Sequence, residues 1–313
     1  PKMAIRGNLL PQALIFRSAS PLRNPKPNTN LTSRSQASTG IASGRRLPFP
    51  SHRSNTPNSN AGLLFREKLI YLEALNVDSS KVLSENPDLR TTSVDSIRSV
   101  ENCLSSMGIR RSAVGRIFNM LPQLLTCDPH GDLYPFLDFI LSEVNISFPD
   151  VRRTITQCPR LLVCSLDDQL RPTLHFLRDF GFVGPNAVTW RTSLLLVSSV
   201  ENTFLPKIAY FRNLGFSHDE VVTMVLRSPG LLSFSINNNF EPKLEYFLKD
   251  MKGNLVELKR FPQYFSYSLE GKIKPRHQRL VQHGLSLPLS DLLKLSDANF
   301  NVQLIEMQLQ SAE

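Results

Sequence analysis

Prolines recur in this chain as pairs whose members stand thirteen residues apart. The pairs are Pro122–Pro135, Pro159–Pro172, Pro229–Pro242 and Pro262–Pro275. Their first members belong to an anchor position that returns at intervals of 33 to 37 residues, at Pro87, Pro122, Pro159, Ser193, Pro229 and Pro262. The unit at Ser193 has lost its first proline and keeps only the second, Pro206. A loose period near 35 residues predicts a solenoid, whose supersecondary units bury their apolar faces only against their neighbours.

Other residue types keep the same register. An apolar pair begins two residues after the anchor, at Leu124-Leu125, Leu161-Leu162, Leu195-Leu196, Leu231-Leu232 and Tyr264-Phe265. A serine stands six residues after it, at Ser165, Ser199, Ser235 and Ser268. A glycine stands nine residues after the second proline, at Gly181, Gly215 and Gly284. Agreement in several columns indicates one repeated unit rather than scattered prolines.

The local pattern predicts what each unit is. After the second proline of one unit, Leu174, Leu177 and Phe180 fall on a single helical face, and the glycine that follows is a typical helix stop. In the next unit, Ser217 with Glu220 three residues later predicts a capping box at the start of a second helix, which the next anchor proline ends. No segment alternates with period two. The predicted fold class is therefore all-α, a right-angled stack of two-helix repeats that forms an α-solenoid superhelix.

The repeated motifs P-x-L-L-x-x-S and L-x-P-x-L/I-x-F/Y-L/F-x-x-L/F-G resemble those of the mitochondrial transcription termination factor (mTERF) family, in particular its plant organellar members. The resemblance covers about residues 63 to 300. It implies units of two antiparallel helices and a short 3-10 turn, a curved superhelix, a basic groove for nucleic acid, and a role in organellar gene expression. The chain departs from the pattern at Ser193, at Met251 in place of the turn glycine, and in a polar last unit, KIKPRHQRLVQHG. These departures concern local helix geometry.

Residues 1–60 contain nine Lys and Arg and no Asp or Glu, and they are rich in Ser, Thr, Asn and Pro. This composition is typical of an organellar transit peptide, with an ordinary disordered tail as the alternative. The Met3-Ala4 opening and the abundant hydroxyl residues favour the chloroplast as the target compartment. Arginines among apolar residues leave the mitochondrion as the alternative. We therefore expect a disordered leader over residues 1–60, a helical repeat domain of about six units over residues 61–300, and a C-terminal tail over residues 301–313.

The net charge of +9 comes from the leader, because the remaining 253 residues carry 27 basic and 27 acidic side chains. Within that part, residues 61–150 hold 8 basic and 12 acidic side chains, whereas residues 151–280 hold 18 and 11. We therefore expect any phosphate-binding groove to lie in the later repeats, with an ordinary solvated face as the alternative.

Three cations, Lys207, Lys243 and Arg276, directly follow the second proline. If that proline occupies the first helical position, these cations stand at the positive end of the helix dipole, where a phosphate would meet a cation and free N–H groups together. If the helix begins instead at the serine column, they lie inside the helix and the dipole argument fails. The sequence leaves both boundaries open.

Further candidates for nucleic-acid binding are less specific. Arg191, Arg227 and Arg260 precede the anchor by two residues, where a cation at a helix C-terminus is stabilising without any ligand. Arg178 and Arg212 share another column, and the turns carry an unpatterned set of cations, Arg160, Arg171, Lys272 and Lys274. Arginine suits bidentate phosphate contact, which supports its inclusion.

The remaining chemistry is sparse. The aromatic column Phe139, Phe176, Tyr210 and Tyr246 has the periodicity of a helix core, although stacking on bases is the alternative. Trp190, the single tryptophan, falls near the end of an expected helix, and we expect it in the core too. The four cysteines and six histidines form no ligand pattern, and no catalytic motif is present.

We therefore expect no enzyme, no cofactor, no metal and no membrane segment. The predicted protein is a monomer that binds double-stranded DNA or RNA and acts in transcription, its termination or its regulation, with other organellar gene-expression proteins as further partners. An RNA factor for transcript maturation or intron splicing is one alternative, and a protein-interaction scaffold is another.

Overall fold

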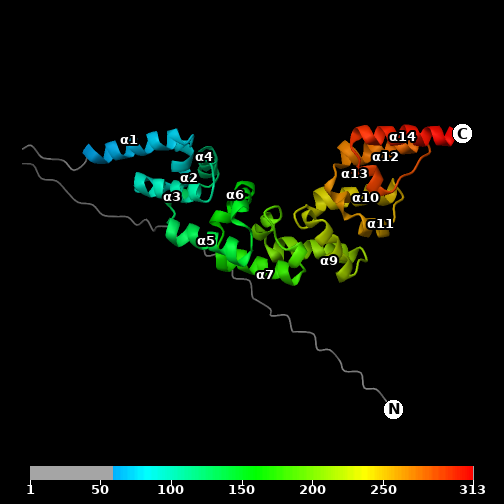
Figure 1. Cartoon of the computed structure of the whole chain (residues 1–313), viewed down its shortest axis with the longest axis horizontal. Coiled ribbons are helices and arrows are strands. Elements are labelled where there is room, and N and C mark those ends of the chain that lie inside the picture. Colours follow the sequence, from blue (N-terminus) through cyan, green and yellow to red (C-terminus); the bar gives the residue numbers. More distant parts are fainter. Residues whose placement is uncertain (1–58, 313) are drawn as a thin grey trace, which may run out of the picture. The chain divides into compact units, whose positions relative to one another are not determined.

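The computed structural model describes residues 59–312, and within that span every regular element is a helix (Figure 1). The predicted all-α fold is confirmed. The expected leader lies outside the described residues except for its last two, which begin the first helix. The α-helices are α1 (Ser59–Ala74), α2 (Ser79–Glu85), α3 (Val94–Ser106), α4 (Arg111–Met120), α5 (Tyr134–Asp138), α6 (Phe148–Gln157), α7 (Arg171–Asp179), α8 (Leu205–Asn213), α9 (His218–Arg227), α10 (Glu241–Lys249), α11 (Leu255–Arg260), α12 (Lys274–Gln282), α13 (Leu289–Lys294) and α14 (Asp297–Ala312).

Each predicted anchor begins a short 3-10 turn. These turns are η1 (Pro87–Arg90), η2 (Pro122–Thr126), η5 (Pro159–Val163), η8 (Ser193–Val197), η10 (Pro229–Leu232) and η12 (Pro262–Ser266), and one further 3-10 turn is η7 (Gly184–Asn186). All five apolar pairs after the anchors are buried. Successive turns also contact one another, as η5 does η8 and η10 does η12. The turns therefore fill the space between neighbouring units, because proline stops the helix and the apolar pair must be buried.

The first helix of most units begins earlier than the second proline. Leu170 N–H donates to Ser165 O over 3.0 Å, and Phe204 N–H donates to Ser199 O over 3.3 Å, so a wide first turn starts at the serine column. These serines cap the helix, since each accepts a hydrogen bond from a backbone N–H three residues on. The wide turns are η3 (Pro129–Leu133), η6 (Leu166–Leu170), η9 (Val200–Phe204), η11 (Ile236–Phe240) and η13 (Leu269–Ile273), with a similar turn, η4 (Phe139–Glu143), after α5. A helix start at the second proline is therefore wrong.

The glycine column behaves as predicted, with φ of 112° at Gly181 and 92° at Gly215. Where glycine is missing, the left-handed position moves one residue on: Lys252, after Met251, has a φ of 55°. The capping box of Ser217 and Glu220 is also present at the start of α9. Local chemistry therefore sets the boundaries of most units.

The fourth unit differs from the others, because it lacks its second helix. Residues 182–192 form only the turn η7 and an irregular segment where α4, α6 and α9 stand in other units. The next anchor, Ser193, directly follows this segment. The hydroxyl of Ser193 is buried and donates to Trp190 O over 2.9 Å, a hydrogen bond that proline cannot make.

The aromatic column lies in or against one continuous apolar core. Phe211 and Phe240 have ring centroids 4.9 Å apart, and Phe240 and Phe265 5.1 Å, so rings from neighbouring units interlock. Phe176 stacks on Phe204 at 5.7 Å in the same way. Core packing is therefore the role of this column.

Helix α14 runs across the expected boundary at residue 300 and contributes Phe300 and Leu304 to the core. Across residues 59–312, the helices are too short or too polar to span a bilayer.

Candidate nucleic-acid interface

The three cations that follow the second proline are buried inside the repeat array. Lys207 and Lys243 are 8% and 7% exposed, and their ammonium groups donate to Leu232 O over 2.5 Å and to Phe265 O over 2.6 Å. Each acceptor belongs to the 3-10 turn of the next unit. Burial lowers the pKa of both lysines. The dipole argument fails for them, because they lie inside the helix and point into the protein.

Arg276 has the same position in the last unit and is 4% exposed. It donates to Leu292 O over 2.7 Å and to the Asp297 carboxylate over 2.5 Å. Lys68 in α1 does the same at the other end, reaching Leu89 O over 2.7 Å. We call this set, Lys68, Lys207, Lys243 and Arg276, the inter-unit clamp. A buried charged donor that satisfies backbone carbonyls of a neighbouring element stabilises the junction between them.

The second, third and fourth units lack this cation, since their clamp positions hold Glu101, Phe136 and Thr173. In the fourth unit Gln169 takes over, donating to Ser198 O over 2.9 Å. An amide therefore replaces the ammonium where the sequence offers no lysine.

Four other predicted cations contact neighbouring groups of this chain. Arg171 pairs with Glu143 at 2.9 Å and also with Asp167, and Lys274 pairs with Glu270 at 2.5 Å. Arg178 is exposed and donates to Glu143 O. Lys272, half-buried, lies 4.9 Å from the Tyr267 ring centroid. The two acid-paired side chains, Arg171 and Lys274, carry their own counter-charges, which weakens their attraction for a phosphate.

The remaining predicted cations are exposed: Arg160, Arg191, Arg212, Arg227 and Arg260. Arg191, Arg227 and Arg260 belong to the column that precedes the anchor. Backbone contacts join this column between units, since Gln157 donates to Arg191 O over 3.3 Å and Gln263 to Arg227 O over 3.1 Å.

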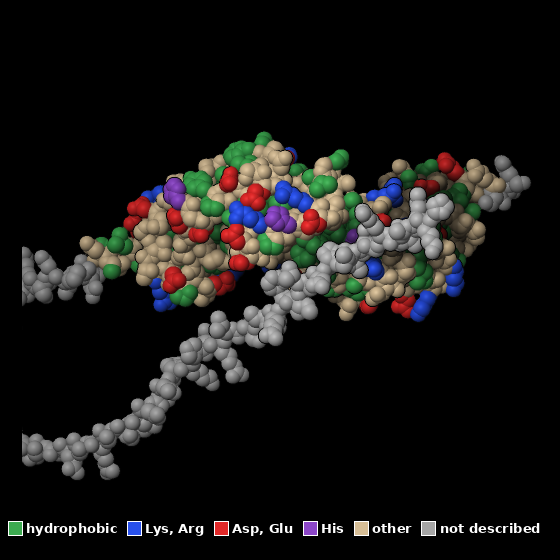
Figure 2. All heavy atoms as spheres, turned by 90° about the horizontal axis from the view of Figure 1, so that it is seen from below, with side chains coloured by type: hydrophobic (Ala, Val, Ile, Leu, Met, Phe, Trp, Pro, Cys, Tyr) green, Lys and Arg blue, Asp and Glu red, His purple; other side chains and the backbone are tan. Residues whose placement is uncertain are grey.

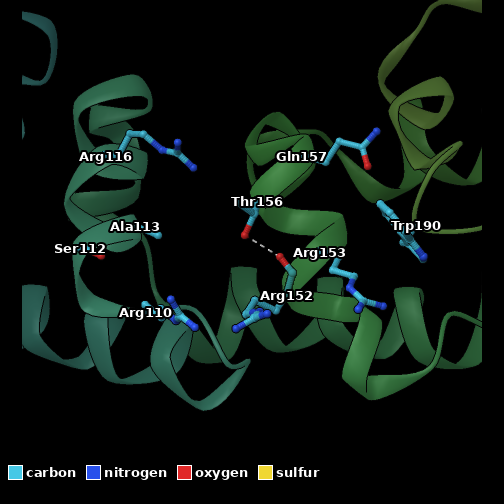
Figure 3. A pocket seen from close by; sticks show the side chains of 9 residues that line it. All are labelled: Arg110, Ser112, Ala113, Arg116, Arg152, Arg153, Thr156, Gln157 and Trp190. Atoms are coloured by element: carbon cyan, nitrogen blue, oxygen red, sulfur yellow. Dashed lines mark hydrogen bonds between the residues drawn. The ribbon is translucent and has the colours of Figure 1, made fainter. Parts of the chain in front are cut away.

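A hollow of about 590 Å³ lies between α4, α6 and the irregular segment of the fourth unit (Figure 3). We call it the arginine groove. It is lined by Arg110, Ser112, Ala113, Arg116, Arg152, Arg153, Thr156, Gln157 and Trp190. In Figure 3 Arg116 reaches from α4 toward α6, while Arg153 extends toward Trp190. The groove therefore presents four guanidinium groups and one indole ring.

Its electrostatics favour an anionic ligand. No acidic side chain lines the groove, and only Arg153 has a carboxylate partner there, Asp150 at 2.7 Å. The guanidinium groups of Arg110, Arg116 and Arg152 make no hydrogen bond or ion pair with any residue among 59–312. All four arginines are exposed. At Arg110, Arg116 and Arg152 an anion would meet exposed guanidinium groups without breaking an internal ion pair.

Two of its four arginines, Arg110 and Arg116, lie before residue 151, in the part of the chain where the charge count predicted no groove, and the sequence analysis named none of the four. Arg116 and Arg153 share a column six residues before the anchor, so the repeat register contains a signal for two of them. For Arg116 the charge count over residues 61–150 hides this signal, because that part holds 12 acidic side chains and none of them lines the groove. Trp190 is half-buried at the rim of the groove and not in the core.

A second hollow, of about 580 Å³, is lined by two basic side chains, Arg212 and Lys259, and by the acidic Glu220. Lys259 pairs with Glu220 at 2.5 Å, so this hollow has a mixed charge. Figure 2 shows the same mixture on the face in view, where basic and acidic side chains are interspersed. The arginine groove differs from these surfaces by its lack of acids.

Comparisons with known proteins agree with this architecture. The family model described as mTERF matches residues 64–189 and 140–301. The chain is 35% identical over 104 residues to "Transcription termination factor MTERF4, chloroplastic" of Arabidopsis thaliana, which covers 33% of this chain and 19% of that protein. It is 37% identical over 86 residues to "Transcription termination factor MTERF5, chloroplastic" of the same plant, covering 28% and 17%.

A longer alignment joins the chain to "Transcription termination factor MTERF8, chloroplastic" of Arabidopsis thaliana, with 24% identity over 250 residues, 67% of this chain and 49% of that protein. The chain thus spans half or less of the length of these relatives.

Proposed function

The chain belongs to the mTERF family, and from this premise we propose that it binds nucleic acid in the chloroplast and acts in transcription, its termination or its regulation. The names of the relatives, chloroplastic transcription termination factors, support the compartment and the process. The arginine groove supports the mode of binding, because it gathers four guanidinium groups and no acid.

Phosphate contact is the chemistry that such a groove performs best. A guanidinium group presents paired N–H donors that match two phosphate oxygens. Arg110, Arg116 and Arg152 are exposed and unpaired within the described span, so binding a phosphate costs no internal ion pair. Each neutralised phosphate also releases condensed counterions, which makes binding salt-dependent.

We further propose that the exposed column of Arg191, Arg227 and Arg260 contacts phosphates along the later units. Arg160 and Arg212 are further exposed candidates for backbone contact. The inter-unit clamp is not part of the proposed binding surface, because Lys207, Lys243 and Arg276 already donate to buried carbonyls. Phosphate contacts position a ligand, whereas sequence choice requires contacts with bases.

The test is fluorescence anisotropy of labelled duplex DNA and single-stranded RNA with the full chain at several salt concentrations. We expect affinity to fall steeply with salt. The double variant Arg116→Ala/Arg152→Ala should bind about tenfold more weakly, and its log–log salt slope should be shallower by about 1.5, as expected for two lost phosphate contacts.

The matched control is Arg66→Ala/Lys249→Ala, which removes the same charge from exposed positions on α1 and α10. It should bind nearly as the wild type does. Equal losses in both double variants would show that net charge alone attracts the ligand and would contradict the groove. Absence of binding to any nucleic acid would favour the protein-interaction scaffold.

A further inference from the structure

Trp190 stands where the fourth unit has lost its second helix. The irregular segment leaves the half-buried indole at the rim of the arginine groove, and the ring also borders a second hollow of about 480 Å³ on its other side. In the other units a helix occupies this place. The loss of the helix therefore opens a site that the rest of the array does not have.

The backbone around the ring is held firmly. Ser193 donates to Trp190 O over 2.9 Å, Thr189 N–H donates to the Thr192 hydroxyl over 2.9 Å, and Gln157 donates to Arg191 O over 3.3 Å. Phe182 and Val188 anchor the start of the segment in the core. The ring is thus preorganised, and a ligand need not order a loose loop.

Two arginines make cation–π contacts with the Trp190 ring. The guanidinium carbons of Arg153 and Arg191 lie 5.5 Å and 5.0 Å from its centroid. An exposed cation–π contact is weaker than the stacking of a base on an aromatic ring, so a base can displace one of them. A displaced guanidinium would remain close enough to contact the phosphate of the same nucleotide.

We infer that Trp190 stacks on an unpaired nucleobase whose flanking phosphates are held by the arginine groove. The inference rests on the proposed function and narrows its ligand to a single strand. In a duplex the faces of a base are covered by its neighbours, whereas an unpaired base offers a free face. The arginines supply the affinity for the backbone, and the indole supplies the preference for a single strand.

The experiment exploits the fact that Trp190 is the only tryptophan of the 313-residue chain. Tryptophan fluorescence of the full chain is titrated with a single-stranded RNA of about 12 nucleotides, the same sequence as single-stranded DNA, and the corresponding duplex. Anisotropy of the labelled strands is recorded in parallel. We expect both single strands to quench the emission and to protect it from acrylamide, at the concentrations at which anisotropy saturates. The duplex should leave it unchanged.

Substitutions separate stacking from simple attachment. Trp190→Leu should weaken single-strand binding by on the order of tenfold and leave duplex binding unchanged, whereas Trp190→Phe should retain most of the affinity. The matched control is Phe148→Leu, which removes an exposed ring from α6 outside the groove and should change nothing. Circular dichroism checks that each variant keeps the helicity of the wild type. If a variant fails to fold, the quenching of the wild-type emission by single strands and by duplex still tests the role of Trp190.

The outcomes distinguish this inference from the proposed function. Groove-dependent binding without quenching, or equal quenching by duplex and single strand, would overturn the role of Trp190 and leave nucleic-acid binding intact. Absence of any binding by anisotropy would contradict both the proposed function and the role of Trp190. Tighter binding of RNA than of DNA, with quenching by each, would support stacking and identify RNA as the ligand.

Discussion

At the residue scale, two lysines on the same helix have opposite environments. Lys243 and Lys249 both belong to α10. Lys243 is 7% exposed and donates to a buried carbonyl of the next unit, while Lys249 lies in solvent and pairs with Glu245 at 2.7 Å. A buried acceptor that loses its donor costs much more free energy than an exposed ion pair that breaks.

We predict that Lys243→Met, which keeps the apolar stem and removes the ammonium group, lowers the free energy of unfolding by about 1–3 kcal/mol. The cause is the unsatisfied carbonyl of Phe265. Urea denaturation measures it. Lys249→Ala is the control and should change stability by less than about 0.5 kcal/mol. Equal effects of the two substitutions would refute the clamp.

At the scale of elements, helices approach closely where glycine permits it. Gly115 in α4 faces the chain just after α1, and a Cβ added there would lie 1.8 Å from Leu75 O. Such a backbone contact cannot be relieved by a side-chain movement. The close approach therefore depends on the missing side chain of one residue.

We predict that Gly115→Ala lowers the free energy of unfolding by about 1–3 kcal/mol, although alanine is the better helix former. Gly62→Ala in α1 provides the control, because nothing lies within 4 Å of its added Cβ. That substitution should raise stability by up to about 1 kcal/mol. Chemical denaturation gives both values, and effects of the same sign would show that the contact is not rigid.

At the scale of the whole molecule, each unit contacts mainly its neighbours, so stability should be local. Arg276 connects α12 to both α13 and α14, through Leu292 O and the Asp297 carboxylate, and its guanidinium carbon lies 4.7 Å from the Phe300 ring centroid. Its loss should loosen the last helices without unfolding distant units, as expected for a nearly one-dimensional array.

We predict that Arg276→Ala accelerates amide hydrogen exchange in α12, α13 and α14 by about tenfold or more, and leaves α3 and α4 unchanged. Gln278→Ala, at an exposed position of α12, should leave the pattern as in the wild type. Mass spectrometry of exchanged peptides locates the effect. Uniform acceleration along the chain would indicate a single cooperative unit.

The sequence by itself determined the repeat unit and most of its boundaries. The anchors predicted every inter-unit 3-10 turn, because at five of the six anchors a proline, which cannot donate the backbone hydrogen bond, follows the preceding helix and ends it. The glycine column and the capping box of Ser217 and Glu220 were likewise predictable, because these devices act within a few residues. The family resemblance rested on the same local columns.

Only the tertiary structure decided which cations face solvent. Lys207 and Arg116 look equally available in the sequence, but the first ends at a carbonyl of the next unit and the second lines a groove. Trp190 lines the groove from an irregular segment that replaces a helix, and Ser193 donates to its carbonyl oxygen. The direction of a long side chain depends on the neighbouring unit that it meets, and a sequence column records residue type without that neighbour.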